Sequence, residues 1–411
     1  MHVDQIPKFL QSTFRPQRRW FSRIGFDHFR FLVVALLINA RSTKLSHLAS
    51  AIPNQGHRTS HARFLSSDWD APGVLAAQAE RIFRQMKPGK GEAIYLLIDD
   101  TRIRKRGKKM DAISKIWDQK TNSFMHGHVL ATAAIHFRGV TIPWAIELWI
   151  PKAQADSGYR KLTQIAVSFI QGFPNLGKSK VRVLFDAAYL AVNVTKACES
   201  RGFTWFSVAA RNRNLLRRGT KKQIKKLAPG VLRYHGHRIR VKRSRGWRWM
   251  RIASVVGVLG KTGEVRLVCS KRSGPSSKEL LSVVTNETKM KPREIIITYE
   301  KRWNIEVLFK ELRNSLGLGE YQVLSRTAIE RHLHLSCLAH QTLTHQAIME
   351  EGAQAKQENK DVILPTLNQQ IQKFRQRVNR DRTNRLLNRI KDRKLKSKLR
   401  SYLLKEAAVA A

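Results

Sequence analysis

Two aspartates stand where apolar runs of strand length end. Asp99 follows the apolar part of YLLIDDT, and Asp186 follows that of VLFDAAYL. Carboxylates at the ends of neighbouring strands point into one crevice, and their hard oxygens suit Mg²⁺, which takes its other ligands from water or phosphate. A single aspartate at a strand end more often caps a turn or a helix. Two such strands in one chain favour a divalent-metal site.

A third acid, Glu306, belongs to a segment with helical spacing. The segment reads TYEKRWNIEVLFKELRNSLGLG, and it predicts a helix over 298–316 that Gly317 ends. One face carries polar residues three or four positions apart: Tyr299, Arg302, Glu306, Lys310 and Arg313. A second face carries the apolar residues expected to be buried: Ile305, Leu308, Leu312 and Leu316.

The polar face of this predicted helix has two interpretations. It can place the acid on a metal ion and the cations on phosphates. It can equally be a solvated face with ion pairs between residues four apart, such as Glu306 with Lys310. The spacing alone leaves both open.

The elements around the two aspartates alternate in an order that indicates the fold class. We expect three strands, a helix, a strand, a helix and a strand, over 93–98, 129–137, 140–149, 157–172, 181–185, 192–199 and 203–208. This is the order of a ribonuclease-H-like fold, an α/β fold whose mixed sheet carries helices on its faces. The strands that end at Asp99 and Asp186 both belong to this core.

Segments of other character flank and interrupt the predicted core. Residues 1–90 are expected to form a helical N-terminal DNA-binding domain, similar to a helix-turn-helix, although a plain helical bundle fits the pattern as well. The core itself is expected in two parts, 91–208 and 286–350, separated by a basic β-rich insertion over 209–285. A basic helical C-terminal tail follows over 351–411.

The chain of 411 residues is strongly basic. Its 77 Lys and Arg against 30 Asp and Glu give a formal net charge of +47. Such a chain repels itself in isolation and is expected to bind a polyanion, with nucleic acid the leading candidate. The composition argues against a metabolic enzyme acting on a small-molecule substrate.

The basic residues concentrate in two stretches. No acid occurs between Glu199 and Glu264, whereas that stretch carries eighteen Lys and Arg, and residues 373–405 carry fourteen. A phosphate-backbone surface explains such one-sided charge better than a solvated face, because each neutralised phosphate releases condensed counterions. We expect DNA contacts in the first stretch from Arg240, Lys242, Arg243 and Arg245.

Two tryptophans, Trp247 and Trp249, alternate with arginines in the same stretch. They could stack on bases or enter a minor groove, or they could face the core as in an ordinary strand. The pattern leaves these alternatives open.

The cysteines and apolar runs bear on the compartment. Cys198, Cys269 and Cys337 are too few and too far apart for a disulfide scaffold or a CxxC zinc site. The longest apolar run near the start, 31–38, is far shorter than the ~20 residues of a membrane helix. The first ten residues lack the features of a signal peptide. We therefore expect a protein of the reducing cytoplasm without a membrane partner.

The three acids together resemble the D, D, E triad of the DDE-type transposases of bacterial insertion sequences. Tyr299, Arg302 and Glu306 match the Y-(2)-R-(3)-E part of the Y-R-E-K signature of one large branch of that superfamily. In that branch a β-rich insertion separates the second Asp from the Glu, and here 120 positions separate Asp186 from Glu306. The lysine of the signature falls at Arg313, which keeps the charge but changes its geometry.

The first acid of the triad has two neighbouring candidates. Asp99 directly follows the apolar strand, and with Thr101 it fits the family's D-x-T pattern. Asp100 is the alternative.

The resemblance implies phosphodiester cleavage and strand transfer on double-stranded DNA, at the element ends and at a target. Two Mg²⁺ or Mn²⁺ ions, held by Asp99, Asp186 and Glu306, would activate water and then a DNA 3′-hydroxyl. The residues expected to contact phosphates are Tyr299, Arg302, Lys310 and Arg313. The resemblance also implies a homodimer on DNA, in the bacterial cytoplasm at the nucleoid.

Two other functions compete with this one. A nuclease on the same fold would cleave DNA without joining it, and an inactive protein derived from a transposase would only bind DNA. The complete triad argues against the inactive protein. The long basic insertion and basic tail argue against a small nuclease.

Overall fold

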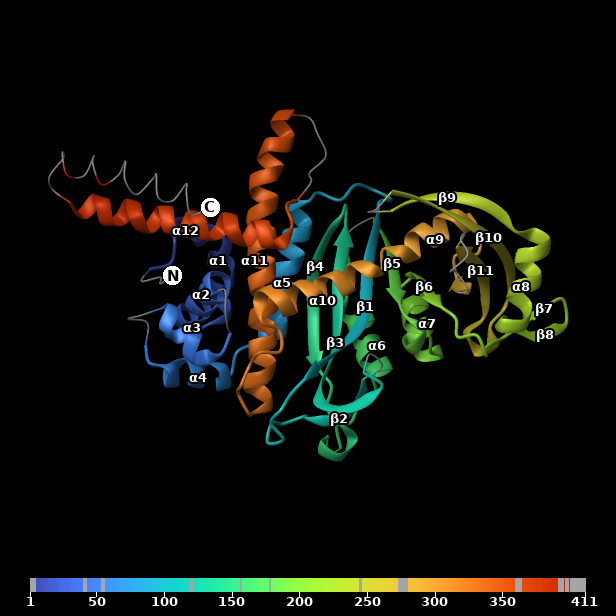
Figure 1. Ribbon diagram of the computed structural model, residues 1–411, viewed down its shortest axis with the longest axis horizontal. Helices are drawn as coiled ribbons and strands as arrows, with labels where there is room; N and C mark the ends of the chain where they lie inside the picture. Colours follow the sequence, from blue (N-terminus) through green and yellow to red (C-terminus); the bar gives the residue numbers. More distant parts are fainter. Residues whose placement is uncertain are drawn as a thin grey trace. The chain divides into compact units, whose positions relative to one another are not determined.

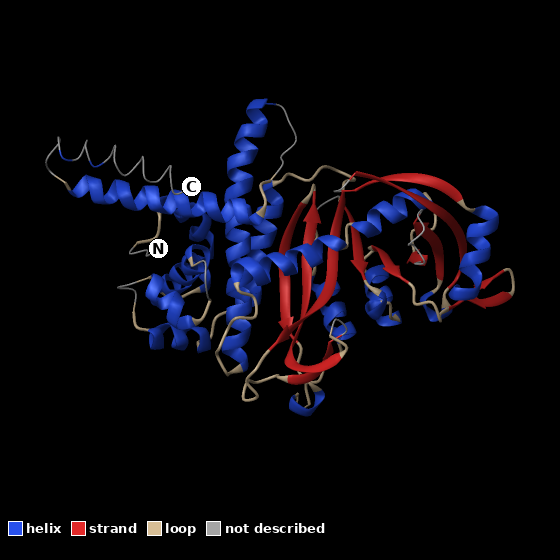
Figure 2. Ribbon diagram, in the orientation of Figure 1, coloured by secondary structure: helices blue, strands red, loops and turns tan. Residues whose placement is uncertain are grey.

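The structure is a computed structural model that describes residues 5–39, 43–52, 56–118, 121–155, 157–176, 179–243, 246–272, 280–358 and 364–390, with 395 and 399. The chain divides into two compact units (Figure 1). Unit 1 comprises Met1–Met86, Arg104–Ile113 and Phe309–Ala411, and unit 2 comprises Lys87–Ile103 and Ser114–Leu308. The described part of unit 1 is mostly helical, whereas unit 2 holds the sheet (Figure 2).

Unit 1 is built around the long helix α11, Arg326–Glu358, which packs against α2, α4 and α5. The N-terminal helices are α1 (Gln11–Phe14), α2 (Arg23–Ile38), α3 (Leu45–Ala51), α4 (Arg58–Ser66) and α5 (Ala71–Gln85), with short 3-10 turns at Lys8–Leu10 and Arg15–Trp20. Every residue of α2 from Phe31 to Ile38 is buried, so this helix forms part of the core. The Ser22 side chain accepts the Gly25 N–H and caps its start.

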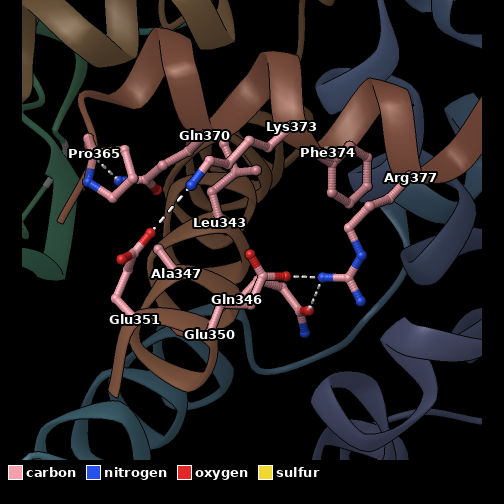
Figure 3. Close-up of a pocket in the computed structure, with 10 residues that line it drawn as sticks. All are labelled: Leu343, Gln346, Ala347, Glu350, Glu351, Pro365, Gln370, Lys373, Phe374 and Arg377. Atoms are coloured by element: carbon pink, nitrogen blue, oxygen red, sulfur yellow. Dashed lines mark hydrogen bonds and ion pairs between the residues drawn. The ribbon is translucent and has the colours of Figure 1, made fainter. Parts of the chain in front are cut away.

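The basic helix α12, Leu367–Arg389, packs on α11. Figure 3 shows Lys373 and Arg377 of α12 reaching toward glutamates of α11. Lys373 Nζ lies 3.1 Å from Glu351 Oε1, and Arg377 pairs with Glu350. The apolar side of α12 is buried, at Leu367, Ile371, Phe374, Val378 and Leu387. This first part of the basic tail is therefore a packed element of unit 1.

Unit 2 contains the core sheet. Its strands are β1 (Ala93–Arg104), β2 (Ser114–Asp118), β3 (Ser123–Phe137), β4 (Val140–Leu148), β5 (Lys180–Phe185) and β6 (Thr204–Val208). Neighbouring strands follow the order β3–β1–β5–β6, with β4 on β3, and β1, β5 and β6 run parallel (Figure 1). The helices α6 (Leu162–Gly172) and α7 (Val192–Ser200) connect the strands. This mixed α/β arrangement is consistent with the predicted ribonuclease-H-like core.

Several predicted boundaries in this core were wrong. Strand β1 continues past Asp99 to Arg104, and the strand pair that β2 forms with the start of β3 was not foreseen. The helix expected from residue 157 begins at Leu162. Local apolar patterns located these elements but not their ends, because pairing with a neighbouring strand extends a strand beyond its apolar run.

The segment after β6 continues the same sheet. It comprises β7 (Asn214–Arg217), β8 (Thr220–Gln223), α8 (Ile224–His235), β9 (His237–Arg243), β10 (Gly246–Val258), β11 (Glu264–Arg272) and β12 (Leu280–Thr285). Strand β12 pairs with β6, and the order runs β12–β11–β10–β7–β8. The insertion predicted to be β-rich over 209–285 also holds a helix, because strand β9 begins only at His237. Val231 lies instead in α8, where residues at helical spacing are buried.

The helix predicted over 298–316 is divided into α9, Pro292–Glu300, and α10, Trp303–Leu316. Lys301 and Arg302 form a turn in which each N–H donates to the carbonyl three residues earlier, at 3.1 and 3.0 Å. These tighter bonds interrupt the α-helix at Lys301 and Arg302. The predicted apolar stripe is confirmed, because Ile305, Leu308, Leu312 and Leu316 are all buried. Gly317 ends the helix with φ +64°.

No helix within the described ranges is long and apolar enough to cross a membrane. The division of the chain into five functional segments remains a proposal, because the two units report packing and not function.

Candidate active site and nucleic-acid interface

The register of two parallel strands brings Asp99 and Asp186 together. Ile98 of β1 pairs with Phe185, the last residue of β5, and an aspartate follows each of them: Asp99 within β1 and Asp186 just after β5. The Asp186 side chain also accepts the Ala188 N–H at 2.8 Å and caps a short 3-10 turn over Ala187–Tyr189. Ser207 of β6 donates its hydroxyl to the Asp186 carbonyl at 2.9 Å. Asp186 is therefore both a turn cap and a fixed member of the acid pair.

Arg302 connects the first acid to the third. Its Nη1 lies 2.6 Å from Asp99 Oδ2, and its Nη2 lies 2.5 Å from Glu306 Oε1. The Asp99 and Arg302 side chains are only 13% and 16% exposed. The ion pair between residues four apart in this segment therefore joins Glu306 to Arg302. That arginine stands at the turn between α9 and α10, which aims it at β1.

The electrostatics of Asp99 are unusual for a carboxyl group. The pKa of Asp99 is raised to about 7, chiefly by burial, with smaller rises from the neighbouring Asp186 and Asp100 charges and an opposing effect of Arg302. Because the pKa of Asp99 is raised overall, the Arg302 guanidinium, which Asp99 shares with Glu306, does not fully offset the effect of burial. Perturbed carboxyls of this kind concentrate at functional sites.

Asp100 has a different partner from Asp99. The buried Tyr189 donates its hydroxyl to Asp100 Oδ1 at 3.2 Å. Burial raises the pKa of Asp100, and the Arg102 charge opposes that rise. Asp99, rather than Asp100, is the aspartate that shares Arg302 with Glu306. Sequence reasoning missed Tyr189, whose signal was its place three residues after Asp186.

The predicted phosphate contacts occupy several kinds of position. Tyr299 is buried, and its ring centroid lies 6.0 Å from the Arg302 guanidinium carbon. Burial raises the pKa of Tyr299 to about 12. Lys310 and Arg313 are exposed on α10 and belong to unit 1, whereas the three acids, Tyr299 and Arg302 belong to unit 2.

The acids do not form a ready-made metal cage. Within the residues that the structure describes, no group of three His, Cys, Asp or Glu side chains is arranged to hold a metal ion. The Arg302 guanidinium instead takes the position of a cation between Asp99 and Glu306. The chemistry of the donors nevertheless suits a hard divalent ion, because all three offer carboxylate oxygens.

A second surface of unit 2 carries the basic and aromatic residues of β9 and β10. These strands are antiparallel, with Arg240 opposite Trp249 and Arg238 opposite Arg251. Ile239, Val241, Met250 and Ile252 point to the buried side. The opposite side is exposed, and we call it the ribbon face: Arg238, Arg240, Trp247, Trp249 and Arg251.

On the ribbon face, guanidinium groups stack on the two indoles. The Arg240 guanidinium carbon lies 4.7 Å from the Trp247 ring centroid, and that of Arg238 lies 5.4 Å from Trp249. Both tryptophans are exposed, so the possibility that they face the core is excluded. Of the other predicted DNA contacts, Lys242 lies opposite Trp247 in the register and Arg243 follows it, and only their backbone is described. Arg245 lies outside the described residues.

Comparison with known proteins places this geometry in context. A family model described as "Transposase DDE domain" matches residues 91–341, more than half of the chain. A protein of Microchaete diplosiphon named "Probable transposase for insertion sequence element IS701" is 23% identical over 344 residues, which cover 82% of this chain and 86% of that protein. The match to the family model includes the three acids and the ribbon face. Membership of the Y-R-E-K branch stays a prediction.

Proposed function

The chain belongs to the family of DDE-domain transposases, and from this premise we propose that it cleaves DNA at the ends of an insertion sequence and joins the strands to target DNA. One observation carries the proposal. Asp99 of β1 lies beside Asp186, which directly follows the parallel neighbour β5, and Arg302 connects Asp99 to Glu306. Three acids from distant parts of the chain thus converge in a protein of net charge +47.

We assign the three carboxylates to two Mg²⁺ or Mn²⁺ ions. When bound, such ions activate water and then a 3′-hydroxyl for in-line attack at phosphorus. Asp99 and Asp186 are adjacent and supply the first ligands. Glu306 completes the set once Arg302 releases a carboxylate, because the guanidinium and a divalent ion compete for the same oxygens.

Arg302 accordingly has two roles in the proposed cycle. Without metal it is the counter-ion that keeps Asp99 and Glu306 from repelling each other. With metal and DNA present, the released guanidinium is positioned to donate to a phosphate oxygen. The buried Tyr299 beneath it restricts where it can move. Lys310 and Arg313 remain proposed phosphate contacts on α10.

The partner is double-stranded DNA, both at the element ends and at the target. The ribbon face supplies exposed arginines and indoles for its backbone and grooves, and the basic residues after α12 add further positive charge. We propose that two protomers act together, each on one end, because DNA neutralises the charge that keeps free chains apart. The place of action is the bacterial cytoplasm, at the nucleoid.

The test is a reaction of the protein with DNA that carries its own element ends. We expect excised linear DNA and joined products with Mg²⁺ or Mn²⁺, and neither in EDTA. Cleavage without joining would identify a nuclease on the same fold, and binding without cleavage in either metal would identify an inactive DNA-binding protein. Full activity in EDTA would overturn the metal mechanism. Light scattering should show monomers in the free protein at low salt and two protomers on paired ends.

A further inference from the structure

The strand pair formed by β2 and the start of β3 presents aromatic and basic side chains on one face. Trp117 lies opposite Phe124 in the antiparallel register, and Lys115 lies opposite His126. In an antiparallel pair, directly opposite residues project to the same face, and so do residues two apart on one strand. These four side chains therefore project to the same side. Ile116 points to the other side and is buried. We call this set of four residues the hairpin face.

The aromatic pair on the hairpin face is open to solvent. Trp117 is 41% exposed and Phe124 is 59% exposed. Their ring centroids are 4.9 Å apart in an edge-to-face arrangement, and Lys115 Nζ lies 4.6 Å from the Phe124 centroid. Leaving two large aromatic rings in water forgoes the free energy of burying them. Rings next to a cation are a surface suited to flat, negatively charged ligands.

The hairpin face is tied to the strand that carries the first acid. Arg102 of β1 donates from Nη1 to the Trp117 carbonyl oxygen at 3.1 Å. Arg102 follows Asp99 by three residues, roughly 10 Å along an extended strand. The same guanidinium lies near enough to Asp100 for its charge to act on that carboxyl group. The hairpin face is therefore linked through Arg102 to the strand that carries Asp99 and Asp100.

We propose that the hairpin face binds unpaired nucleotides of DNA, with bases stacked on Trp117 and Phe124 and phosphates neutralised by Lys115 and Arg102. Within a duplex both faces of an internal base are covered, so a stacking surface of this kind selects bases that are unpaired or at an end. A second copy of the chain is a poorer occupant, because it would bring the same cations together in a protein of net charge +47. This proposal rests on the proposed function only for the identity of the DNA as its substrate.

The experiment measures stacking directly and in EDTA, so that it does not depend on cleavage. The full-length protein is mixed with a duplex carrying a short single-stranded overhang, with the fluorescent base 2-aminopurine in the overhang. A matched oligonucleotide carries the same base within a fully paired duplex. We expect quenching of the overhang probe alone, and affinity for the overhang DNA above that for the paired DNA.

The variants Trp117→Leu and Phe124→Leu keep an apolar side chain but remove the ring. Each should reduce overhang affinity on the order of 10-fold and abolish part of the quenching, while affinity for the paired duplex stays unchanged. Lys115→Gln should lower the salt dependence of overhang binding by roughly 0.7 in the logarithmic slope. Tyr234→Leu is the matched control, because Tyr234 is an exposed aromatic residue of α8 that also lies near an arginine.

Three results would overturn the proposal. Equal losses on overhang and paired DNA would make the face a general duplex contact. Unchanged quenching in the Trp117→Leu, Phe124→Leu double variant would place the stacking elsewhere. A dimer of the free protein that this double variant dissociates, seen by light scattering, would assign the face to a second copy. Thermal melting of each variant shows whether it is folded. Both substitutions are at exposed positions, where a change of side chain usually alters the free energy of unfolding little.

Discussion

The acid site, formed by Asp99, Asp186, Arg302 and Glu306, lies in the same unit as the ribbon face. The two regions are built in opposite ways. The acid site gathers side chains from residues far apart in sequence, with Asp99 and Arg302 separated by 203 positions, and holds them in a partly buried network. The ribbon face draws its residues from one stretch of fourteen positions, 238–251, and leaves them exposed. In the first, Asp99 and Glu306 share the opposite charge of Arg302. In the second, the described charges are all positive, and two of them, Arg238 and Arg240, stack on indole rings.

This difference reflects what each region has to do. In-line attack at phosphorus requires particular oxygens at particular positions, and low exposure keeps them fixed. Holding a polyanion requires only a density of positive charge that follows its backbone. Substitutions should accordingly have all-or-none effects at the acid site and graded effects on the ribbon face. Four predictions follow that comparison from the largest expected effect to the smallest.

The largest effect is expected from neutral variants of the three acids. Asp99→Asn, Asp186→Asn and Glu306→Gln each remove a ligand charge with little change in volume. Cleavage should fall by more than about 100-fold, because altering even the outer shell of a metal site costs roughly 10- to 100-fold. DNA binding, measured by gel shift, should be retained. Asp100→Asn is the matched control, and its loss of activity would make Asp100 the first ligand in place of Asp99.

The second prediction concerns the stability of the metal-free protein. The folded state raises the pKa of Asp99 to about 7 from its ordinary 3.8, chiefly through burial. The folded protein therefore binds this proton more tightly than the unfolded chain does. The stability it contributes is complete below pH 4 and is lost as the pH rises through about 7.

Asp99→Asn removes this titration, so the variant should gain stability relative to the wild type between pH 4 and pH 8. The gain should reach a few kcal/mol at most, since each pH unit corresponds to about 1.4 kcal/mol. Urea unfolding in EDTA across this range measures it. A difference between the two proteins that does not change with pH would show that Asp99 is not desolvated in the free protein.

The third prediction concerns the ribbon face. Arg240→Ala removes a positive charge and the guanidinium that stacks on Trp247. Affinity for duplex DNA should fall several-fold, and the logarithmic salt slope should decrease by about 1. The cleavage rate at saturating DNA should stay unchanged. Lys196→Ala, at an exposed position of α7, is the control for charge alone, and an equal loss there would deny the ribbon face any special role.

The smallest effect is expected from the end of the chain. Residues 391–411 carry seven Lys and Arg against two acids, and deleting them should weaken binding modestly to all DNA sequences alike. Deleting the tail from residue 371 is not equivalent to this shorter deletion, because it also removes the buried Ile371, Phe374 and Val378. That longer deletion should lower the melting temperature. A change in base preference after the shorter deletion would instead make this segment a reader of sequence.

Much of the candidate site could be predicted from local patterns. Apolar runs located the strand that carries Asp99 and the strand that Asp186 follows, and spacing located the buried stripe around Glu306. Composition identified a binder of polyanions. These features depend on residues close together in the chain, where periodicity follows from the geometry of one helix or strand.

Other features required the tertiary structure. The alternation in β10 could not show whether Trp247 and Trp249 face the core, because the choice depends on which side of the sheet is covered. The extension of β1 to Arg104 and the hairpin face likewise depend on pairing between strands. Tyr189 became a partner of Asp100 only through the packing of its turn against β1.

The sequence by itself determined the residue types, the charge of +47 and the positions of most of the elements that carry the acids. Only the tertiary structure decided that Arg302 would lie between Asp99 and Glu306. The reason is that this contact combines a strand register, Ile98 opposite Phe185, with a break between two helices at Lys301 and Arg302. The spacing of residues within one segment predicts neither the register nor the break, because each depends on what the segment packs against.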